Sequence, residues 1–200
     1  MRKRPVSVLL AMAAAAILAP AASASTPATH WLHGGVELGQ GEEVKVAGSG
    51  KLTIHDQQLG FTVRCQASEE GEIVGGGIGN GFNFFRPFTF AACSAPKPDP
   101  CSFGTSLQLV ASGEQGFWEG RLTSTKPVGD DIQSLTVQLR CGSESGPSYH
   151  GSVTPKLGKS SLSFSPRSGE LEDAAGERLS IKGRLGMRAS AGSPIVTAVL

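Results

Sequence analysis

Short runs in which apolar and polar residues alternate, separated by glycines, constrain the fold of this chain most. In one run Phe61, Val63 and Cys65 share a face, while Thr62 and Arg64 share the other. A side-chain period of two is typical of a β-strand with one buried face. Glycine makes up 27 of the 200 residues and supplies frequent breaks between such runs. The pattern therefore predicts many short strands.

The same alternation recurs along the chain, and no sustained helical stripe follows the N-terminal segment. Further strands are predicted around Val44 and Val46, Leu52 and Ile54, Ser106 to Ala111, Phe117 to Thr123, Leu135 to Cys141, Tyr149 to Val153, Leu162 to Phe164, Leu179 to Ile181 and Ile195 to Val199. The predicted fold class is all-β, an antiparallel β-sandwich or barrel with two disulfides. A true immunoglobulin domain is not expected, because Leu139 stands where that family has a tyrosine.

The N-terminus has the pattern of a secretory signal peptide, assigned to residues 1–24. Arg2, Lys3 and Arg4 precede an apolar run that closes on the small residues Ala22-Ser23-Ala24. The rest, 25–200, is expected to form a single secreted β domain. A weak internal repeat is suggested around 51–71 and 121–146. The expected location is secreted or extracytoplasmic, in the cell envelope.

Charge limits the classes of partner. The chain carries 18 basic and 17 acidic residues, and loss of the three basic residues at the N-terminus leaves a net charge near −2. A phosphate-tracking surface needs a basic excess, so no nucleic-acid partner is expected. No later apolar stretch reaches the roughly 20 residues of a membrane span, so no stable membrane anchor is expected either. The expected partner is an extracellular or envelope protein or glycan.

Four cysteines in an exported chain predict two disulfides. Cys93 and Cys101 bracket a proline-rich segment, whereas Cys65 and Cys141 each end an alternating strand. The spacing favours Cys65–Cys141 and Cys93–Cys101 among the three possible pairings. A structural zinc site is not expected, because no two of the cysteines are two to four residues apart.

The segment between Cys93 and Cys101 is a candidate partner surface. Its prolines hold the backbone extended and stiff, and a local disulfide would clamp it. A clamped loop presents its side chains at low ordering cost. The candidate residues are Pro96, Lys97, Pro98, Asp99 and Pro100.

A phenylalanine-rich run from Phe82 to Phe90 is a second candidate site. On a continuous strand Phe82, Phe84 and Phe88 would face one way with Arg86 among them, and Pro87 would mark a break or an edge. These four residues form a candidate aromatic pocket with Arg86 as its polar group. The alternative interpretation is a core strand that carries aromatic bulk.

No motif predicts a catalytic, metal or cofactor site. The glycine run 75–81 lacks the pattern of a phosphate-binding loop and is expected to lead into the phenylalanine-rich run. His30 and His33 have a spacing that can share a metal, but no third ligand is evident, and a frayed N-terminus is expected there. The enzyme assignment is left open, leaning against catalysis.

Paired carboxylates supply the one catalytic alternative, a glycan-active hydrolase. Candidate acids in or beside predicted strands are Glu37, Glu42, Glu43, Glu119, Glu170 and Glu172. Such an enzyme needs two carboxyls facing each other across a sugar, and Trp31, Trp118 or Tyr149 would stack on the ring. A second alternative is a secreted protease inhibitor that uses the 93–101 loop.

The layout of the chain resembles a group of small secreted all-β proteins of high-GC Gram-positive bacteria. The resemblance rests on the strand ends Val63-Arg64-Cys65 and Leu139-Arg140-Cys141, the glycine run, and the phenylalanine-rich run that ends at Cys93, with Cys101 nearby. The group has no known activity, so the resemblance implies export and a β fold alone. The leading expectation is a non-enzymatic binding or structural protein outside the cytoplasm.

Overall fold

The computed structural model describes residues 28–76, 81–94, 96–101, 107–113, 116–123 and 126–189, together with the backbone of 195–199. Within these residues regular structure is β throughout, apart from the short 3-10 helix η2 (Pro166–Ser168). The strands are β1 (Thr29–His33), β2 (Val36–Glu37), β3 (Glu43–Asp56), β4 (Thr62–Val74), β5 (Phe82–Phe85), β6 (Thr89–Ala91), β7 (Leu107–Ser112), β8 (Trp118–Leu122), β9 (Asp130–Cys141), β10 (Glu144–Val153), β11 (Lys156–Gly158), β12 (Ser161–Phe164), β13 (Glu170–Glu172), β14 (Arg178–Ala189) and β15 (Ile195–Val199). The predicted all-β class is confirmed.

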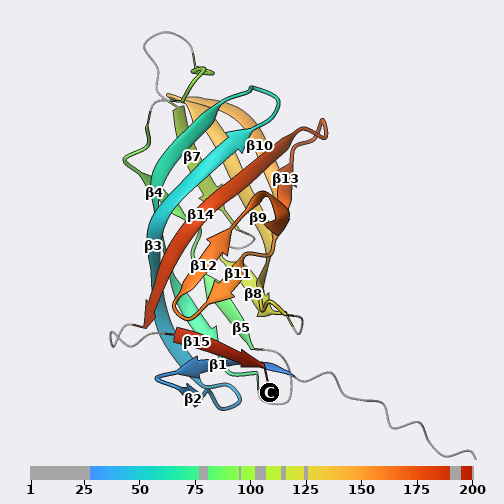
Figure 1. Ribbon diagram of the computed structural model, residues 1–200. Helices are drawn as coiled ribbons and strands as arrows, with labels where there is room; N and C mark the ends of the chain where they lie inside the picture. The colour runs from blue at the N-terminus through green and yellow to red at the C-terminus, as the bar shows by residue number, and fades with distance from the viewer. Residues whose placement is uncertain are drawn as a thin grey trace, which may run out of the picture.

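The large sheet closes on itself. Its strands follow the order β11-β12-β14-β13-β10-β9-β8-β5-β4-β3, and β14 pairs antiparallel with β3 from Leu179↔Asp56 to Ala189↔Val46. That pairing closes a ring that runs from β14 through β13, β10, β9, β8, β5 and β4 to β3, and β12 and β11 extend from β14. The long strands β14 and β3 lie side by side at the front of Figure 1. Of the two architectures predicted, the closed barrel is the one observed.

Side chains that point inward at every second residue of a strand fill the interior of this barrel. In β4 the side chains of Val63, Cys65 and Ala67 are buried, and those between them are exposed. The buried apolar side chains of the described residues form one cluster, whose largest fully buried members are Trp118, Tyr149, Phe61 and Phe85. At about 25 cal/mol per Å² of apolar surface, this interior is the main source of stability.

A small three-stranded sheet, β15–β1–β2, lies across one end of the barrel (Figure 1). Trp31 of β1 is 3% exposed, and its Nε1 donates a hydrogen bond of 3.1 Å to the carbonyl oxygen of Phe82. The expectation of a frayed terminus at His30 and His33 is therefore wrong. The pairing of β1 with β15, from the far end of the chain, gives no local signal in the sequence.

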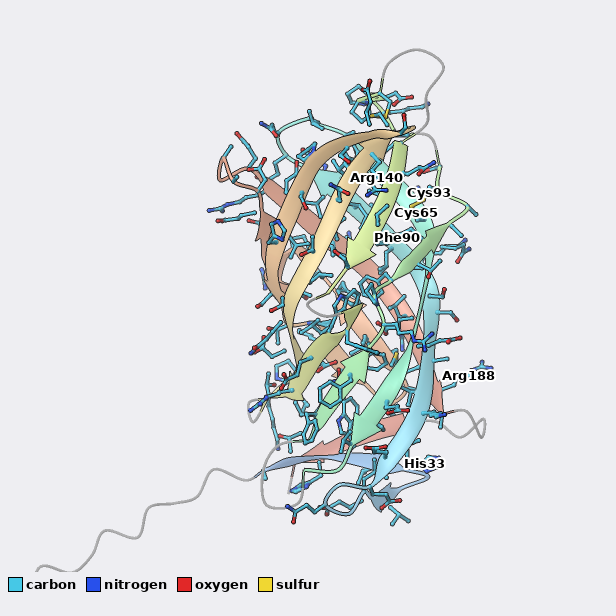
Figure 2. All side chains as sticks on the ribbon, turned by 180° about the vertical axis from the view of Figure 1, so that it is seen from behind. His33, Cys65, Phe90, Cys93, Arg140 and Arg188 are labelled. Atoms are coloured by element: carbon cyan, nitrogen blue, oxygen red, sulfur yellow. A yellow bond between two sulfur atoms is a disulfide. The ribbon has the colours of Figure 1, made fainter. Side chains whose placement is uncertain are left out.

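The predicted cysteine pairing is also wrong. The disulfides are Cys65–Cys93, whose sulfurs lie side by side in Figure 2, and Cys101–Cys141. The pairing of β6 with β4 places Ala91 opposite Gln66, which brings Cys93 to Cys65. On the other side, β7 pairs with β9 and places Leu107 opposite Cys141, near Cys101. The two disulfides thus reinforce neighbouring strands instead of linking β4 directly to β9.

Residues 1–27 lie outside the described part of the chain, so the predicted signal peptide stays a prediction. Among the described residues, no helix has the length and apolar character needed to cross a bilayer.

Candidate functional site

A groove of about 500 Å³ opens on the outer face of β3, β4 and β5. Its lining residues come from these three strands, from the segment after β5 and from the residue before β8. They are Lys45, Val46, Ala47, Glu70, Gly71, Glu72, Phe84, Arg86 and Phe117. Four of them are charged and two are phenylalanines. The groove therefore offers both apolar and charged contacts.

Strand register brings the floor of the groove together. Lys45 of β3 lies opposite Glu72 of β4, and Glu72 lies opposite Phe84 of β5. Residues directly opposite each other across antiparallel strands have Cβ atoms about 5 Å apart. A cation, a carboxylate and an aromatic ring consequently form one row across three strands.

Phe84 faces outward because its neighbours on β5 face inward. Asn83 and Phe85 are buried, whereas Phe84 is 40% exposed. The ring of Phe82 contacts that of Phe84 edge to face, with 5.6 Å between centroids. Phe117, 49% exposed, also lines the groove and directly precedes β8, the strand that pairs with β5. Such exposure of large apolar side chains is uncommon in this chain: Val36 and Leu59 are the other two in the described residues.

Pro87 ends the regular pairing of β5 and thereby splits the predicted aromatic pocket. Arg86 still follows the outward direction of Phe84, and its backbone nitrogen donates a hydrogen bond of 2.8 Å to the carbonyl oxygen of Glu70. Phe88, however, lies in the core, 4.1 Å from Trp118 between ring centroids. Phe84 and Arg86 line the groove and Phe82 supports it, but the placement of Phe88 in a pocket is wrong, because the chain changes direction at the proline.

The proline-rich segment spans two disulfides and is not clamped by one. Cys93 is tied to β4 and Cys101 to β9, so the segment connects these two parts of the barrel. Pro96 is buried, Lys97 forms a β-bridge with Thr62, and Lys97, Pro98 and Asp99 are exposed. Asp99 Oδ1 accepts a hydrogen bond of 3.0 Å from the backbone nitrogen of Cys101. The segment ends at the half-buried Pro100 and is held against the barrel. None of its described residues lines the groove of β3, β4 and β5.

Two buried carboxyls, Glu69 and Asp130, form a second unusual feature inside the barrel. Burial, together with the nearby charge of Asp130, raises the pKa of Glu69 to about 8. Burial likewise raises the pKa of Asp130 to about 7, against the lowering effect of a hydrogen bond from Asn83. Both oxygens of Glu69 and Oδ2 of Asp130 have no hydrogen-bond partner among the described residues. At neutral pH, Glu69 is therefore mostly protonated.

The features that the hydrolase hypothesis needs do not come together. Trp31, Trp118 and Tyr149 are 3%, 1% and 0% exposed, so none of them is available to stack on a sugar. Among the candidate acids, Glu170 and Glu172 pair with Arg178, and Glu119 pairs with Arg121. His30 Nδ1 lies 2.8 Å from Glu37 Oε1. No group of three or more His, Cys, Asp or Glu suited to a metal occurs in the described part of the chain.

Several groove residues escaped the sequence analysis. The sequence places Phe117 at the start of a predicted strand, and it singles out none of Lys45, Glu70 and Glu72 as a candidate site residue. Their proximity follows from the β3–β4–β5 register, which the alternation along a single strand does not reveal.

The fold and groove define an all-β barrel protein with an amphipathic surface groove. No family model, curated protein or solved structure matches this chain. The resemblance to small secreted proteins of high-GC Gram-positive bacteria therefore remains a prediction.

Proposed function

We propose that this chain is a non-catalytic binding protein that works outside the cytoplasm, with the groove of Phe84 and Phe117 as its binding site. The observation that carries the proposal is the position of these two exposed rings on one groove that also holds four charged side chains. Exposed apolar side chains gathered in a concave surface are typical of binding sites.

The lining of the groove suits a peptide segment with an apolar side chain next to charged ones. Phe84 and Phe117 would cover the apolar side chain. Burial of the exposed part of each ring, 40% and 49%, would stabilise a complex by roughly 1 kcal/mol per ring. Arg86 offers a planar donor to a carboxylate. Glu70 and Glu72 offer acceptors to a cation. Charges of both signs set the orientation of the ligand and exclude a purely apolar one.

Two disulfides in the described fold support a location outside the cytoplasm, where such bonds persist. The signal peptide expected over residues 1–24 supports the same proposal. A secreted or envelope protein partner is consistent with both features.

Neither alternative gains support from the observed geometry. Glu69 and Asp130, the charge of which raises the pKa of Glu69, are 3% and 0% exposed, so a glycan would reach neither in this conformation. The protease-inhibitor hypothesis assumed a loop clamped by its own disulfide, and the observed pairing removes that clamp.

Site-specific photo-crosslinking tests the proposal. A photoreactive phenylalanine analogue replaces Phe84 in one variant and Leu59 in a control; the natural side chains are 40% and 39% exposed. Each variant is exposed to the envelope and secreted proteins of its host. The proposal predicts a discrete adduct at position 84 that is absent at 59. Identical adduct patterns at both positions, or none at 84, would contradict it.

A further inference from the structure

Five cations gather on the outer surface of three neighbouring strands, β14, β3 and β4. Figure 1 shows these strands side by side across the front of the barrel. The cations are Lys51, Arg64, Lys182, Arg184 and Arg188, and all five are exposed. We call this surface the basic face. It stands out because the chain as a whole is close to neutral, with 18 basic and 17 acidic residues.

Strand register makes the basic face a continuous strip. Arg184 lies directly opposite Lys51, and Thr53 lies opposite both Lys182 and Arg64, on its two sides. Alternate residues of a strand are about 7 Å apart, and neighbouring strands are about 4.8 Å apart. The three cations of β14 consequently span about 20 Å along one line.

Within the part of the chain that the structure describes, no ion pair joins an acidic side chain to any of these five cations. Glu70 of β4 shares a row with Arg188, with Ala47 of β3 between them. The residues between them on the three strands include Ser49, Thr53, Gln66 and Gly186, none of which is charged. The ion pairs among the described side chains lie elsewhere: Arg121 with Glu119, Arg178 with Glu170 and Glu172, and His30 with Glu37. Like charges directly opposite each other destabilise a sheet, so the Arg184–Lys51 pair has a cost that the fold does not require.

We infer that the basic face binds a linear anionic polysaccharide through its carboxylate or sulfate groups. A narrow line of several cations spread over about 20 Å suits a chain of repeated anions better than a single small anion. A strongly basic strip attracts such a chain by releasing its counterions. Flanking Ser49, Thr53 and Gln66 supply hydroxyl and amide groups for sugar hydroxyls.

Other polyanions fit this surface less well. Single-stranded nucleic acids are held by aromatic stacking as well as by charge, and these segments of β3, β4 and β14 present no aromatic side chain outward. Membrane-surface binding usually adds apolar side chains that enter the interface, and the strip offers none of these either. Both remain outcomes of the test.

The inference is independent of the proposed function. The basic face adjoins the groove at Ala47, which lies opposite Arg188 and lines the groove. Replacing Phe84 and Phe117 by serine should therefore leave polysaccharide binding intact. Failure of one proposal would not be mistaken for failure of the other.

Binding of the full chain to polygalacturonate, a carboxylate polymer, and to heparin, a sulfated one, tests the inference at about 50 mM and about 500 mM salt. The variant Lys51→Gln with Arg184→Gln removes two cations from the centre of the face. The control, Arg140→Gln with Lys126→Gln, makes the same change in charge elsewhere; Figure 2 shows Arg140 well apart from Arg188. Anionic lipid vesicles and single-stranded DNA are run in parallel.

Salt-sensitive binding to one or both polysaccharides is expected, with about a thirtyfold loss in the Lys51/Arg184 variant, since each surface cation contributes roughly a fivefold gain. The Arg140/Lys126 control should lose at most about twofold. The inference is overturned by an absence of polysaccharide binding at low salt, or by equal losses in the two variants. Tighter binding to vesicles or DNA than to either polysaccharide would also overturn it.

Discussion

Asn83 donates a hydrogen bond of 2.8 Å from Nδ2 to Oδ1 of Asp130, and both side chains are buried inside the barrel. This bond satisfies one oxygen of a carboxyl that forms no ion pair with the described side chains. Oδ2 of Asp130 and both oxygens of Glu69 remain without a partner among the described residues. The interior therefore contains two acids whose ionisation opposes folding.

The two buried acids predict that stability falls as the pH rises. The pKa of Glu69 is about 8 in the folded protein against an ordinary value of 4.5, so the folded state retains a proton that the unfolded chain has lost between these values. Raising the pH from about 5 to about 8 should lower the free energy of unfolding by a few kcal/mol. Urea denaturation across this range measures the slope.

A single substitution isolates the contribution of Glu69. Glu69→Gln removes the ionisable group, so the variant should be more stable than the natural protein at pH 9, and its stability should depend less on pH. Glu70→Gln, at the exposed neighbouring position, is the matched control and should leave the pH profile unchanged. A natural protein that gains stability from pH 5 to pH 8 would contradict the buried position of Glu69.

The observed disulfides predict two similar losses of stability. The bridges Cys65–Cys93 and Cys101–Cys141 close segments with sequence separations of 28 and 40. Chain entropy alone assigns each of them about 4 kcal/mol. Replacing either bonded pair by alanines should lower the unfolding free energy by about that amount.

Peptide mapping under non-reducing conditions tests the connectivity itself. It should recover peptides that join Cys65 to Cys93 and Cys101 to Cys141. A peptide that joins Cys93 to Cys101 would refute the strand neighbours β4–β6 and β7–β9 as described.

On the basic face, we expect one substitution to raise the stability of the protein and to weaken its binding to polysaccharides. Lys51→Glu places a carboxylate opposite Arg184 in the β3–β14 ladder, where two cations now face each other. Opposite charges at such positions contribute roughly 0.2–1 kcal/mol. The variant should therefore be slightly more stable than the natural protein and bind anionic polysaccharides more weakly. The stability of Lys51→Gln should lie between those of the natural protein and Lys51→Glu. A loss of stability in Lys51→Glu would contradict the pairing of Lys51 with Arg184.

Gly183 and Gly186, both on β14, give a matched pair of substitutions. Gly183 has a φ of 145°, and a Cβ there would lie 2.2 Å from the backbone oxygen of Lys51. At Gly186 the nearest atom would be 3.7 Å away. Gly183→Ala should destabilise the protein by about 2 kcal/mol or more, while Gly186→Ala should change stability by less than about 1 kcal/mol. Equal effects in thermal unfolding would contradict the close contact of β14 with β3.

Local alternation in the sequence was enough to predict the class of fold and most of its strands. Thr62 to Cys65 and Leu135 to Cys141 lie in strands, and Val63, Cys65, Leu135, Val137 and Leu139 are buried as expected. Which strands pair with one another depends on contacts between residues far apart in the sequence. For this reason the predicted cysteine pairing was wrong, and the pairing of Thr29–His33 with β15 was not predicted. Phe84 and Arg86 could be singled out from a phenylalanine-rich run, but Phe117, Lys45 and Glu72 join them only through register.

The most direct test of the central claim, that the groove binds a partner, is the affinity of a groove variant for the protein crosslinked at position 84. Phe84→Ser with Phe117→Ser removes both exposed rings, and Val36→Ser with Leu59→Ser removes two exposed apolar side chains outside the groove. Isothermal titration calorimetry should show at least about a tenfold loss for the groove variant, from roughly 1 kcal/mol per ring, and no loss for the control. Equal affinities of the groove variant and the natural protein would contradict the claim.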